Sequence, residues 1–264
     1  MKPFLRWAGS KRRLLPHLRE YWKTSFRRYI EPFAGSASVF FALEPHKAVL
    51  ADINAELINA YIAIRDECDL VVNSLERLPK SCKETYLQLR SLDPSRMPSH
   101  EAATRFIYLN RHCFNGLYRT NLKGQFNVPF SAVKTGAIPS GELLRICSRQ
   151  LSFAKIKYQP FQRTLANARK GDFIYLDPPY LDSSTRIFKE YDAAGFTQPR
   201  LENLRENLVE LAEKEIFFVL SFAESDEGRY LANGFCTKKV EVSRSIAGNA
   251  LHRKVVNELI VTPF

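Results

Sequence analysis

The sequence has few cysteines, and their spacing excludes two kinds of site. Its five cysteines are dispersed along the chain, and none forms a C-x-x-C pair. An odd, scattered set excludes a disulfide framework and a cysteine zinc site, and it is typical of reduced thiols in a cytosolic protein. We therefore expect a cytoplasmic protein that needs no metal.

Long apolar runs, internal repeats and low-complexity tracts are also missing. No segment resembles the stretch of about 20 apolar residues that crosses a bilayer, and no cationic signal peptide is visible, so no membrane partner is expected. With 264 residues, 45% of them hydrophobic, the chain can bury a substantial core. That length fits one large domain, or one domain that carries an insertion.

Acidic residues are scarce in two segments. The chain has 39 Lys and Arg against 28 Asp and Glu, a net charge of +11. No acid occurs between Glu101 and Glu142, and the first 28 residues hold nine basic residues but only one acid, Glu20. Such segments attract phosphates and favour nucleic acid as the partner. A solvated face is the alternative, but aromatic residues and an Asn-Gly turn interleave the middle segment.

Hydrophobic periodicity predicts an α/β fold. A strand in "RRYIEPFAG", a helix in "ASVFFAL" and a strand in "KAVLADIN" make a βαβ unit, which implies a parallel sheet with a ligand at the carboxyl ends of its strands. Helices are predicted from Ala55 to about Leu92 and in "TRFIYLNRHCFN", and a hairpin around Lys123-Gly124.

Strand patterns return in the last part of the chain. They occur in "AKIKYQPF", "GDFIYLDPPY", "IFFVLSFAE" and "KVVNELIVTPF", and a helix with Thr197 as its N-cap is predicted before the third. We expect a discontinuous domain made of residues 1–55 and 141–264. A mostly helical, basic insertion would occupy residues 56–140.

The first candidate site is the glycine turn of "EPFAGSASVF". Gly35 lets the backbone approach a ligand closely, and Asp52 ends the next strand 17 residues later, where a carboxylate can accept both hydroxyls of a ribose. Because the turn is not G-x-G-x-x-G, a nucleoside without a diphosphate is expected. An equally good interpretation of Asp52 alone is a helix N-cap.

The second candidate site is "DPPY", Asp177 to Tyr180. Neither Pro178 nor Pro179 can donate an amide, so the backbone offers only carbonyls, and Asp177 adds a second acceptor. Two acceptors beside an aromatic ring suit a planar base with an exocyclic amine, stacked on Tyr180. An ordinary Asp-Pro turn with a surface tyrosine is the alternative.

Together these motifs resemble the Dam-type DNA adenine-N6 methyltransferases (D12 class, alpha group). The resemblance rests on "FLRWAGSK", "EPFAGSASVF", "LADIN", "IYLNRHCFNGLYRTNLKGQFNVPF", "YLDPPY" and "SRSIAGNALHRKVVNELI", in this order. It implies a Rossmann-like sheet that binds S-adenosylmethionine, with an inserted DNA-recognition domain. Duplex DNA is the implied partner, and no obligate protein partner is evident.

The resemblance also implies roles for individual residues. Trp7, Lys11 and Asp52 would hold the cofactor, Phe33, Gly35 and Ser38 would line its turn, and Asp177 would lie where the methyl donor and the amine meet. Candidate DNA contacts are Arg6, Arg111, Phe114, Asn115, Leu117, Arg119 and Pro129. Phe114-Asn115 would fill the gap left by an extruded base, and Arg119 would read a guanine edge within GATC.

The sequence departs from the family pattern at four places. Ala37 replaces the second glycine of the cofactor turn, and Arg6 replaces a lysine. Ser131, Ala132 and Val133 replace a glycine, an arginine and a tyrosine, so one phosphate contact and one base contact are expected to be missing. "LSFAE" around Phe222 lacks an Asn-His pair that relatives often carry.

The implied reaction is a direct in-line methyl transfer to the adenine amine. Methylation of a cytosine ring carbon needs a cysteine nucleophile, and no Pro-Cys signature is present. Three alternatives stay open: methylation of the cytosine N4 amine, methylation of an RNA adenine, and a DNA-binding protein of this fold that has lost turnover.

Overall fold

The protein is a three-layer α/β structure around one sheet. A computed structural model describes residues 1–7, 9, 11–131, 136–180, 196–245 and 253–264. Within these residues the sheet has seven strands in the order β3-β2-β1-β4-β5-β7-β6. The strands are β1 (Arg28–Glu31), β2 (Ala48–Asp52), β3 (Ala154–Tyr158), β4 (Asp172–Leu176), β5 (Phe217–Ala223), β6 (Cys236–Ser245) and β7 (Arg253–Thr262). The first five are parallel, and β7 runs antiparallel to both of its neighbours.

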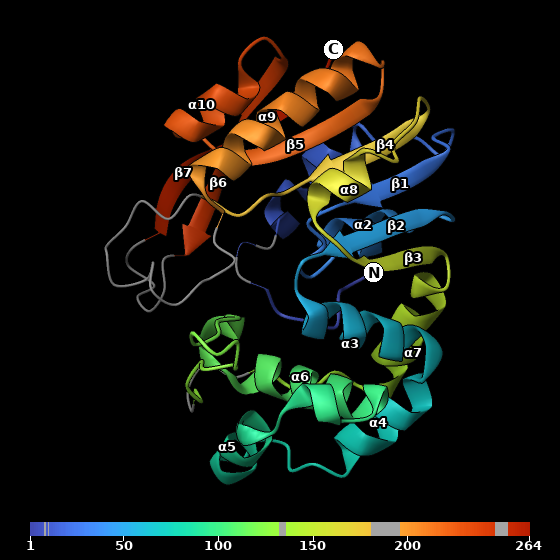
Figure 1. Cartoon of the computed structure of the whole chain (residues 1–264), viewed down its shortest axis with the longest axis vertical. Coiled ribbons are helices and arrows are strands. Elements are labelled where there is room, and N and C mark those ends of the chain that lie inside the picture. Colours follow the sequence, from blue (N-terminus) through green and yellow to red (C-terminus); the bar gives the residue numbers. More distant parts are fainter. Residues whose placement is uncertain (8, 10, 132–135, 181–195, 246–252) are drawn as a thin grey trace.

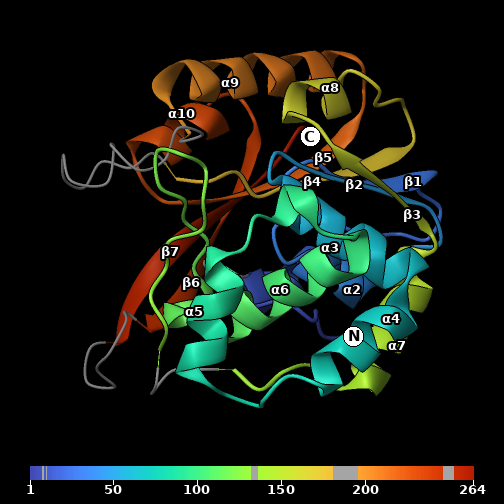
Figure 2. The ribbon, with the colours of Figure 1, turned by 60° about the horizontal axis from the view of Figure 1, so that its bottom comes forward.

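Helices cover both faces of this sheet (Figures 1 and 2). They are α1 (Leu15–Arg19), α2 (Ser38–Leu43), α3 (Ala55–Asp66), α4 (Cys68–Glu76), α5 (Lys83–Ser91), α6 (Ser99–His112), α7 (Gly141–Leu151), α8 (Phe161–Leu165), α9 (Gln198–Glu213) and α10 (Asp226–Ala232). Three short 3₁₀ helices are η1 (Lys11–Leu14), η2 (Pro94–Arg96) and η3 (Phe114–Gly116). None of the described helices has the length and apolar composition needed to cross a bilayer.

The two faces of the sheet have separate cores, because successive side chains of a strand point to opposite sides. In β4, Phe173 and Tyr175 join the core beneath α2 and α3, whereas Ile174 and Leu176 join the core beneath α8, α9 and α10. Figure 2 shows α8, α9 and α10 on one side of the sheet and α2 and α3 on the other. The alternating direction of the side chains thus fixes which residues of a strand face each helix layer.

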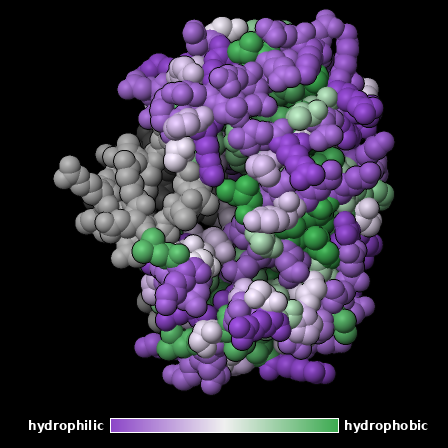
Figure 3. All heavy atoms as spheres, viewed as in Figure 1, coloured by the Kyte–Doolittle hydropathy of each residue, from purple (hydrophilic) through white to green (hydrophobic). Residues whose placement is uncertain are grey.

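Helices α4, α5 and α6 lie farther from the sheet, beyond α3 and α7 (Figure 1). Tyr61 of α3, Tyr108 of α6 and Leu144 of α7 nevertheless belong to the same core cluster as Tyr29 of β1. The helical segment therefore packs onto the sheet layer without a separate core of its own. In the space-filling view, hydrophilic side chains cover most of the visible face, and hydrophobic ones gather near its middle (Figure 3).

The α/β fold class is confirmed, as are the predicted strands that became β1, β2, β3, β4, β5 and β7. Thr197 occupies the N-cap position of α9, but its side chain accepts no capping hydrogen bond. The predicted hairpin exists only as isolated bridges, Cys113 to Phe130 and Thr120 to Phe126, with a turn at Gly124. Strand β6 was not predicted, and the sheet is mixed where a parallel one was expected.

Candidate active site

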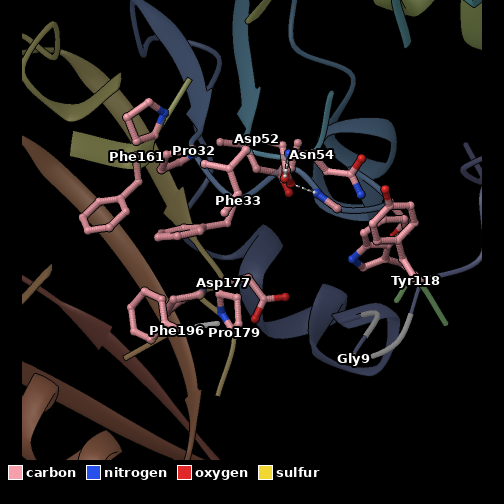
Figure 4. Close-up of a pocket in the computed structure, with 18 of the residues that line it drawn as sticks. Gly9, Pro32, Phe33, Asp52, Asn54, Tyr118, Phe161, Asp177, Pro179 and Phe196 are labelled. Carbon is pink, nitrogen blue, oxygen red and sulfur yellow. Dashed lines mark hydrogen bonds between the residues drawn. The ribbon is translucent and has the colours of Figure 1, made fainter. Parts of the chain in front are cut away.

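The candidate site is a cavity of about 850 Å³ at the carboxyl ends of the parallel strands. Three neighbouring strands each place an acid there: Glu31 ends β1, Asp52 ends β2, and Asp177 follows β4. Figure 4 shows Asp52 and Asp177 on opposite sides of the open space, with Phe33, Phe161 and Phe196 at one end and Tyr118 at the other. The sheet order therefore brings together motifs that are far apart in the sequence.

Asp52 holds the glycine turn to the start of α3. Its Oδ2 accepts a hydrogen bond from the Gly35 amide (3.0 Å), and its Oδ1 accepts one from the Asn54 amide (3.0 Å). The N-cap of α3 is Asn54, whose side chain accepts from the Leu57 amide, so Asp52 is not that cap. Burial raises the pKa of the Asp52 carboxyl above its ordinary value. Each carboxylate oxygen keeps acceptor capacity toward the cavity.

Gly35 leaves room for Trp7 to lie directly on the turn. Gly35 has φ +45°, and a Cβ built there would lie 2.9 Å from Trp7 Cδ1, so any side chain would displace the indole. Ala37, two residues on, adopts the left-handed conformation (φ 49°, ψ 37°) at the N-cap of α2. Alanine tolerates that conformation at a cost of about 1–2 kcal/mol. The replacement of a glycine at this position is thus accommodated by strained backbone.

One end of the cavity is aromatic. Phe33 lies 5.1 Å from Phe161 and 6.2 Å from Phe196, measured between ring centroids. Phe161 begins α8, and Phe196 precedes α9, so the three rings come from separate segments. Of these only Phe33 was predicted as a site residue. Phe161 gave a usable signal, since it is the last residue of the predicted strand segment "AKIKYQPF", but nothing in the sequence indicated Phe196.

Lys11 connects Asp177 to Tyr180. Its Nζ donates to the Tyr180 hydroxyl (2.8 Å) and to Glu258 Oε2 (3.0 Å), and it lies 3.3 Å from Asp177 Oδ1. The Tyr180 hydroxyl donates in turn to Glu258 Oε1 (3.3 Å). Lys11 and Glu258 are 5% and 2% exposed, so both charges are buried and depend on each other. Glu258, on β7, was not predicted.

Tyr180 is half-buried at the edge of the cavity. Its ring makes an edge-to-face contact with Phe222 of β5, at 5.0 Å between centroids. Phe222 lies in "LSFAE", the segment that lacks the Asn-His pair of relatives. Asp177 also faces the cavity, and Pro178 and Pro179 line it. All four residues of the "DPPY" motif thus meet in one place, which an ordinary surface turn does not require.

Glu31 is a buried carboxyl that the sequence interpretation did not use. It is 2% exposed, and the Tyr29 hydroxyl donates to its Oε2 (2.9 Å). Burial raises the pKa of Glu31 well above its ordinary value, and the nearby Asp177 and Asp52 carboxylates raise it further. Within the described residues, no group of three or more His, Cys, Asp or Glu side chains is arranged to hold a metal ion.

The predicted DNA contacts lie outside the cavity, around η3 and the loop that follows it. Phe114 and Leu117 are 40% and 38% exposed, and Pro129 is also exposed. Asn115 adopts a left-handed conformation (φ 55°). Arg6 packs against this segment, since a Cβ on Gly116 would lie 2.7 Å from Arg6 Cβ. The Phe114 amide donates to the Pro129 carbonyl (3.1 Å), so Arg6, η3 and Pro129 lie next to one another.

The two remaining arginines of the set make contacts within the protein. Arg119 Nε donates to Asn127 Oδ1 (2.8 Å), which holds the guanidinium across the loop. Arg111 Nη2 donates to the Phe4 carbonyl (2.5 Å). Burial lowers the pKa of Arg111 to about 10. Of the replaced residues after "NVPF", Ser131 is buried, while Ala132 and Val133 lie outside the described residues.

Comparison with known proteins decides the family. Residues 7–246 match the model of the D12 class N6 adenine-specific DNA methyltransferases. This chain belongs to that family. It is 36% identical to the Type II methyltransferase M1.LlaDCHI of Lactococcus lactis subsp. cremoris, over 100% of this chain and 96% of the relative. It is 32% identical to the DNA adenine methylase of Escherichia coli K12 and 35% identical to that of Haemophilus influenzae, each over 98% of this chain and 94% or 92% of the relative.

Membership in the D12 class establishes the activity in outline. The chain is a DNA adenine methyltransferase that acts on the N6 amine, and DNA is its substrate. The match spans the glycine turn, "DPPY" and the loop after η3, so one family model covers both the cavity and the exposed surface. The resemblance given by the sequence motifs is therefore confirmed.

Proposed function

We propose that this D12 methyltransferase takes its methyl group from S-adenosylmethionine and transfers it to an everted adenine of duplex DNA within GATC. The observation that carries the proposal is the meeting of Asp52, Gly35, Asp177 and Tyr180 in a single cavity. A nucleoside-type ligand and a planar base would lie side by side there. The two candidate sites of the sequence would then be two halves of one active site.

The residues fit the proposed cofactor. Asp52 faces the cavity with unused acceptor capacity, which suits two ribose hydroxyls, and Gly35 offers the close approach that a Cβ would block. Phe33, Phe161 and Phe196 form an apolar, aromatic end where a purine can pack. When bound, S-adenosylmethionine would supply an electrophilic methyl group on a sulfonium. Trp7 and Ser38 complete the wall around the turn.

Asp177 and the Pro178 carbonyl would hold the adenine amine by its two hydrogens. Held in this way, the nitrogen loses conjugation with the ring and directs its lone pair at the methyl group. Displacement in line would then form the N–C bond as the S–C bond breaks, leave the neutral thioether S-adenosylhomocysteine, and need no covalent link between enzyme and base. The methylated amine would release one proton. Because the target atom is inaccessible inside a duplex, the base must be everted, and Tyr180 would stack on it. Pro179 would keep this segment extended and free of amide donors.

Lys11 would act mainly as a positioning residue for these groups. The Lys11 ammonium donates to Tyr180 and Glu258 and forms an ion pair with Asp177 (3.3 Å). When both carboxyls are ionised, the cluster carries one net negative charge beside the reacting atoms. That charge favours a cationic donor and an amine that becomes positive during transfer.

The exposed surface around η3 would read the DNA. Arg119, held by Asn127, would present the free edge of its guanidinium to a guanine in the major groove. Phe114 and Asn115 would occupy the space left by the adenine, and Leu117 and Pro129 would contact neighbouring bases. Arg6 and Arg111 would add positive charge near the backbone phosphates. Under this proposal, residues 56–140 are the recognition segment and residues 1–55 and 141–264 are the catalytic part.

Expression in a host that lacks adenine methylation tests the proposal directly. Single-molecule sequencing of the host DNA should show N6-methyladenine in GATC and at no other adenine. Methylation of another adenine context would overturn the GATC assignment alone. Methylcytosine in DNA, methyladenine in RNA, or no modification despite DNA binding would overturn the proposed reaction.

A further inference from the structure

Tyr118 lies between two proposed DNA contacts, Leu117 and Arg119, yet its ring lines the cavity. It stacks on the Trp7 indole, with 6.1 Å between ring centroids and 18° between ring planes. Trp7 in turn lies against the turn at Gly35. The packed rings of Tyr118 and Trp7 therefore connect the loop after η3 to the turn that would hold the cofactor.

Glu56 fixes the position of Tyr118. The Tyr118 hydroxyl donates to Glu56 Oε1 (3.1 Å), and burial together with the Glu56 carboxylate raises the pKa of Tyr118, so the hydroxyl keeps its proton near neutral pH. Glu56 lies in the first turn of α3, four residues after Asp52. The same contact thus ties the loop to the helix whose start Asp52 holds.

Arg105 fixes Glu56 in turn. Arg105 Nη1 donates to Glu56 Oε2 (2.5 Å), and its Nε donates to the Leu89 carbonyl (2.8 Å) at the end of α5. The side chain is 2% exposed, so this ion pair is shielded from solvent. A buried, hydrogen-bonded ion pair has one favoured geometry, and removing one partner is strongly destabilising. The ion pair between Glu56 and Arg105 therefore joins the loop after η3 to α3, α5 and α6.

We propose that Tyr118 and Glu56 are positioning residues that couple DNA binding to cofactor binding, which extends the function proposed above and rests on it. When the loop settles on the duplex, the Tyr118 ring sets the plane of Trp7 and thereby closes the wall of the cofactor turn. Such a coupling free energy is reciprocal: DNA tightens the cofactor by the same factor by which the cofactor tightens DNA.

The coupling is measured with S-adenosylhomocysteine, which cannot donate a methyl group. Calorimetry gives its Kd for the full chain alone and for the chain saturated with a duplex that contains one GATC. The wild-type ratio of these constants should be about 5-fold or more, the lower end of typical couplings. Tyr118→Leu removes ring and hydroxyl and should bring the ratio to within about 2-fold of one. Tyr118→Phe, which keeps the stack, should give an intermediate ratio.

Tyr86→Phe is the matched control. The Tyr86 hydroxyl donates to the Val128 carbonyl (2.8 Å) of the same loop, but Tyr86 does not line the cavity. The Tyr86→Phe variant should keep the wild-type ratio of the two Kd values even if its DNA affinity falls. If Tyr118→Leu does not fold, Tyr118→Phe carries the test. A wild-type ratio near one, an unchanged ratio in the Tyr118 variants, or an equal loss in Tyr86→Phe overturns the coupling. Failure of the wild type to bind S-adenosylhomocysteine at all would instead overturn the proposed cofactor.

Discussion

At the scale of single residues, Asp52 shows how a carboxylate can serve two purposes. It accepts two backbone amides that shape the site, and it keeps acceptor capacity for a ligand. Its burial raises its pKa, because the low-dielectric surroundings disfavour the charged form. Burial therefore favours the protonated carboxyl, whereas the structural role and the proposed ligand role both favour the ionised carboxylate.

We expect cofactor binding to weaken on acidification, starting at a higher pH than an ordinary aspartate would cause. Only the ionised carboxylate can accept both ribose hydroxyls, and the raised pKa moves its protonation upward in pH. Calorimetric titrations with S-adenosylmethionine across the acidic range check this, and Asp52→Asn should bind weakly with no such pH dependence. A pH dependence that persists in Asp52→Asn would assign the titration to another group.

The pH dependence that Asp52 gives to folding stability should have the opposite sign to the one it gives to cofactor binding. The folded state binds its proton more tightly than the unfolded chain does, so the unfolded chain binds fewer protons between the two pKa values. The contribution of Asp52 to the free energy of unfolding therefore falls as pH rises through this window.

At the scale of elements, the turn between β1 and α2 depends on Gly35. Gly35→Ala places a Cβ 2.9 Å from Trp7 in a left-handed conformation (φ +45°). We expect the free energy of unfolding to fall by about 1–3 kcal/mol and the cofactor Kd to rise by about 10-fold or more. Denaturant unfolding and calorimetry measure the two effects.

Ala37→Gly, in the same turn, is the matched control. It relieves a left-handed alanine (φ 49°) while it removes a buried methyl group and loosens the unfolded chain. These terms are of similar size, so stability should change by less than about 1 kcal/mol. Cofactor affinity should not weaken. A loss as large as that of Gly35→Ala would mean that the turn is sensitive to any substitution.

Strand β7 supplies Glu258, which balances the buried Lys11 (3.0 Å). Glu258→Gln should leave Lys11 free to neutralise Asp177, so kcat should fall by about 10-fold or more while cofactor affinity changes little. Steady-state kinetics separate the two effects. Glu224, which directly follows β5, forms an ion pair with Lys239, and Glu224→Gln is the control that should behave as wild type. Equal kcat values for Glu258→Gln and Glu224→Gln would mean that Glu258 has no role in methyl transfer.

Much of the fold follows from local patterns, and the exceptions have physical causes. The strand "RYIE" is buried at its last three residues and "DFIYL" at all five, as is typical of central strands. Strand β6 reads "CTKKVEVSRS" and lies at the sheet edge, so charged residues interrupt its apolar pattern. The loop after η3 was predicted as a hairpin from Lys123-Gly124, but within the described residues it has isolated bridges in place of paired strands, and Pro129 lacks an amide donor for a strand ladder.

The residues of the candidate site also fall into two groups, those that local sequence patterns predict and those that they do not. Gly35, Asp52, Asp177 and Tyr180 stand in contiguous motifs at strand ends, where the residue types alone indicate a ligand. Glu258 and Phe196 come to the site through tertiary packing between distant segments. A partner far away in the sequence leaves no local signal, so only the structure identifies it.

At the scale of the whole molecule, the net charge of +11 should make DNA affinity strongly dependent on salt. The slope of log Kd against log salt concentration should be about 0.9 for each phosphate that the protein neutralises. Lys123→Ala, at the exposed tip of the loop, should lower this slope by about one while sequence preference stays unchanged. Fluorescence anisotropy over a salt series provides both quantities.

Arg119→Ala, on the same loop, should instead relax discrimination at one guanine of the site. The expected loss is about 1–3 kcal/mol of preference over a duplex with that base pair changed. If Arg119→Ala weakens all duplexes equally, Arg119 contacts phosphate and does not read a base.

The main proposal is that Asp177 holds the amine of an adenine stacked on Tyr180, beside the methyl donor. Its most direct test is mass-spectrometric detection of N6-methyladenine in a defined GATC duplex after reaction with wild-type protein and with Asp177→Ala. Lys11 stays paired with Glu258 in the variant, so folding and DNA affinity should be retained. We expect methylation by the wild type and a loss of about 10²-fold or more in the variant. Turnover at the wild-type rate in Asp177→Ala would contradict it.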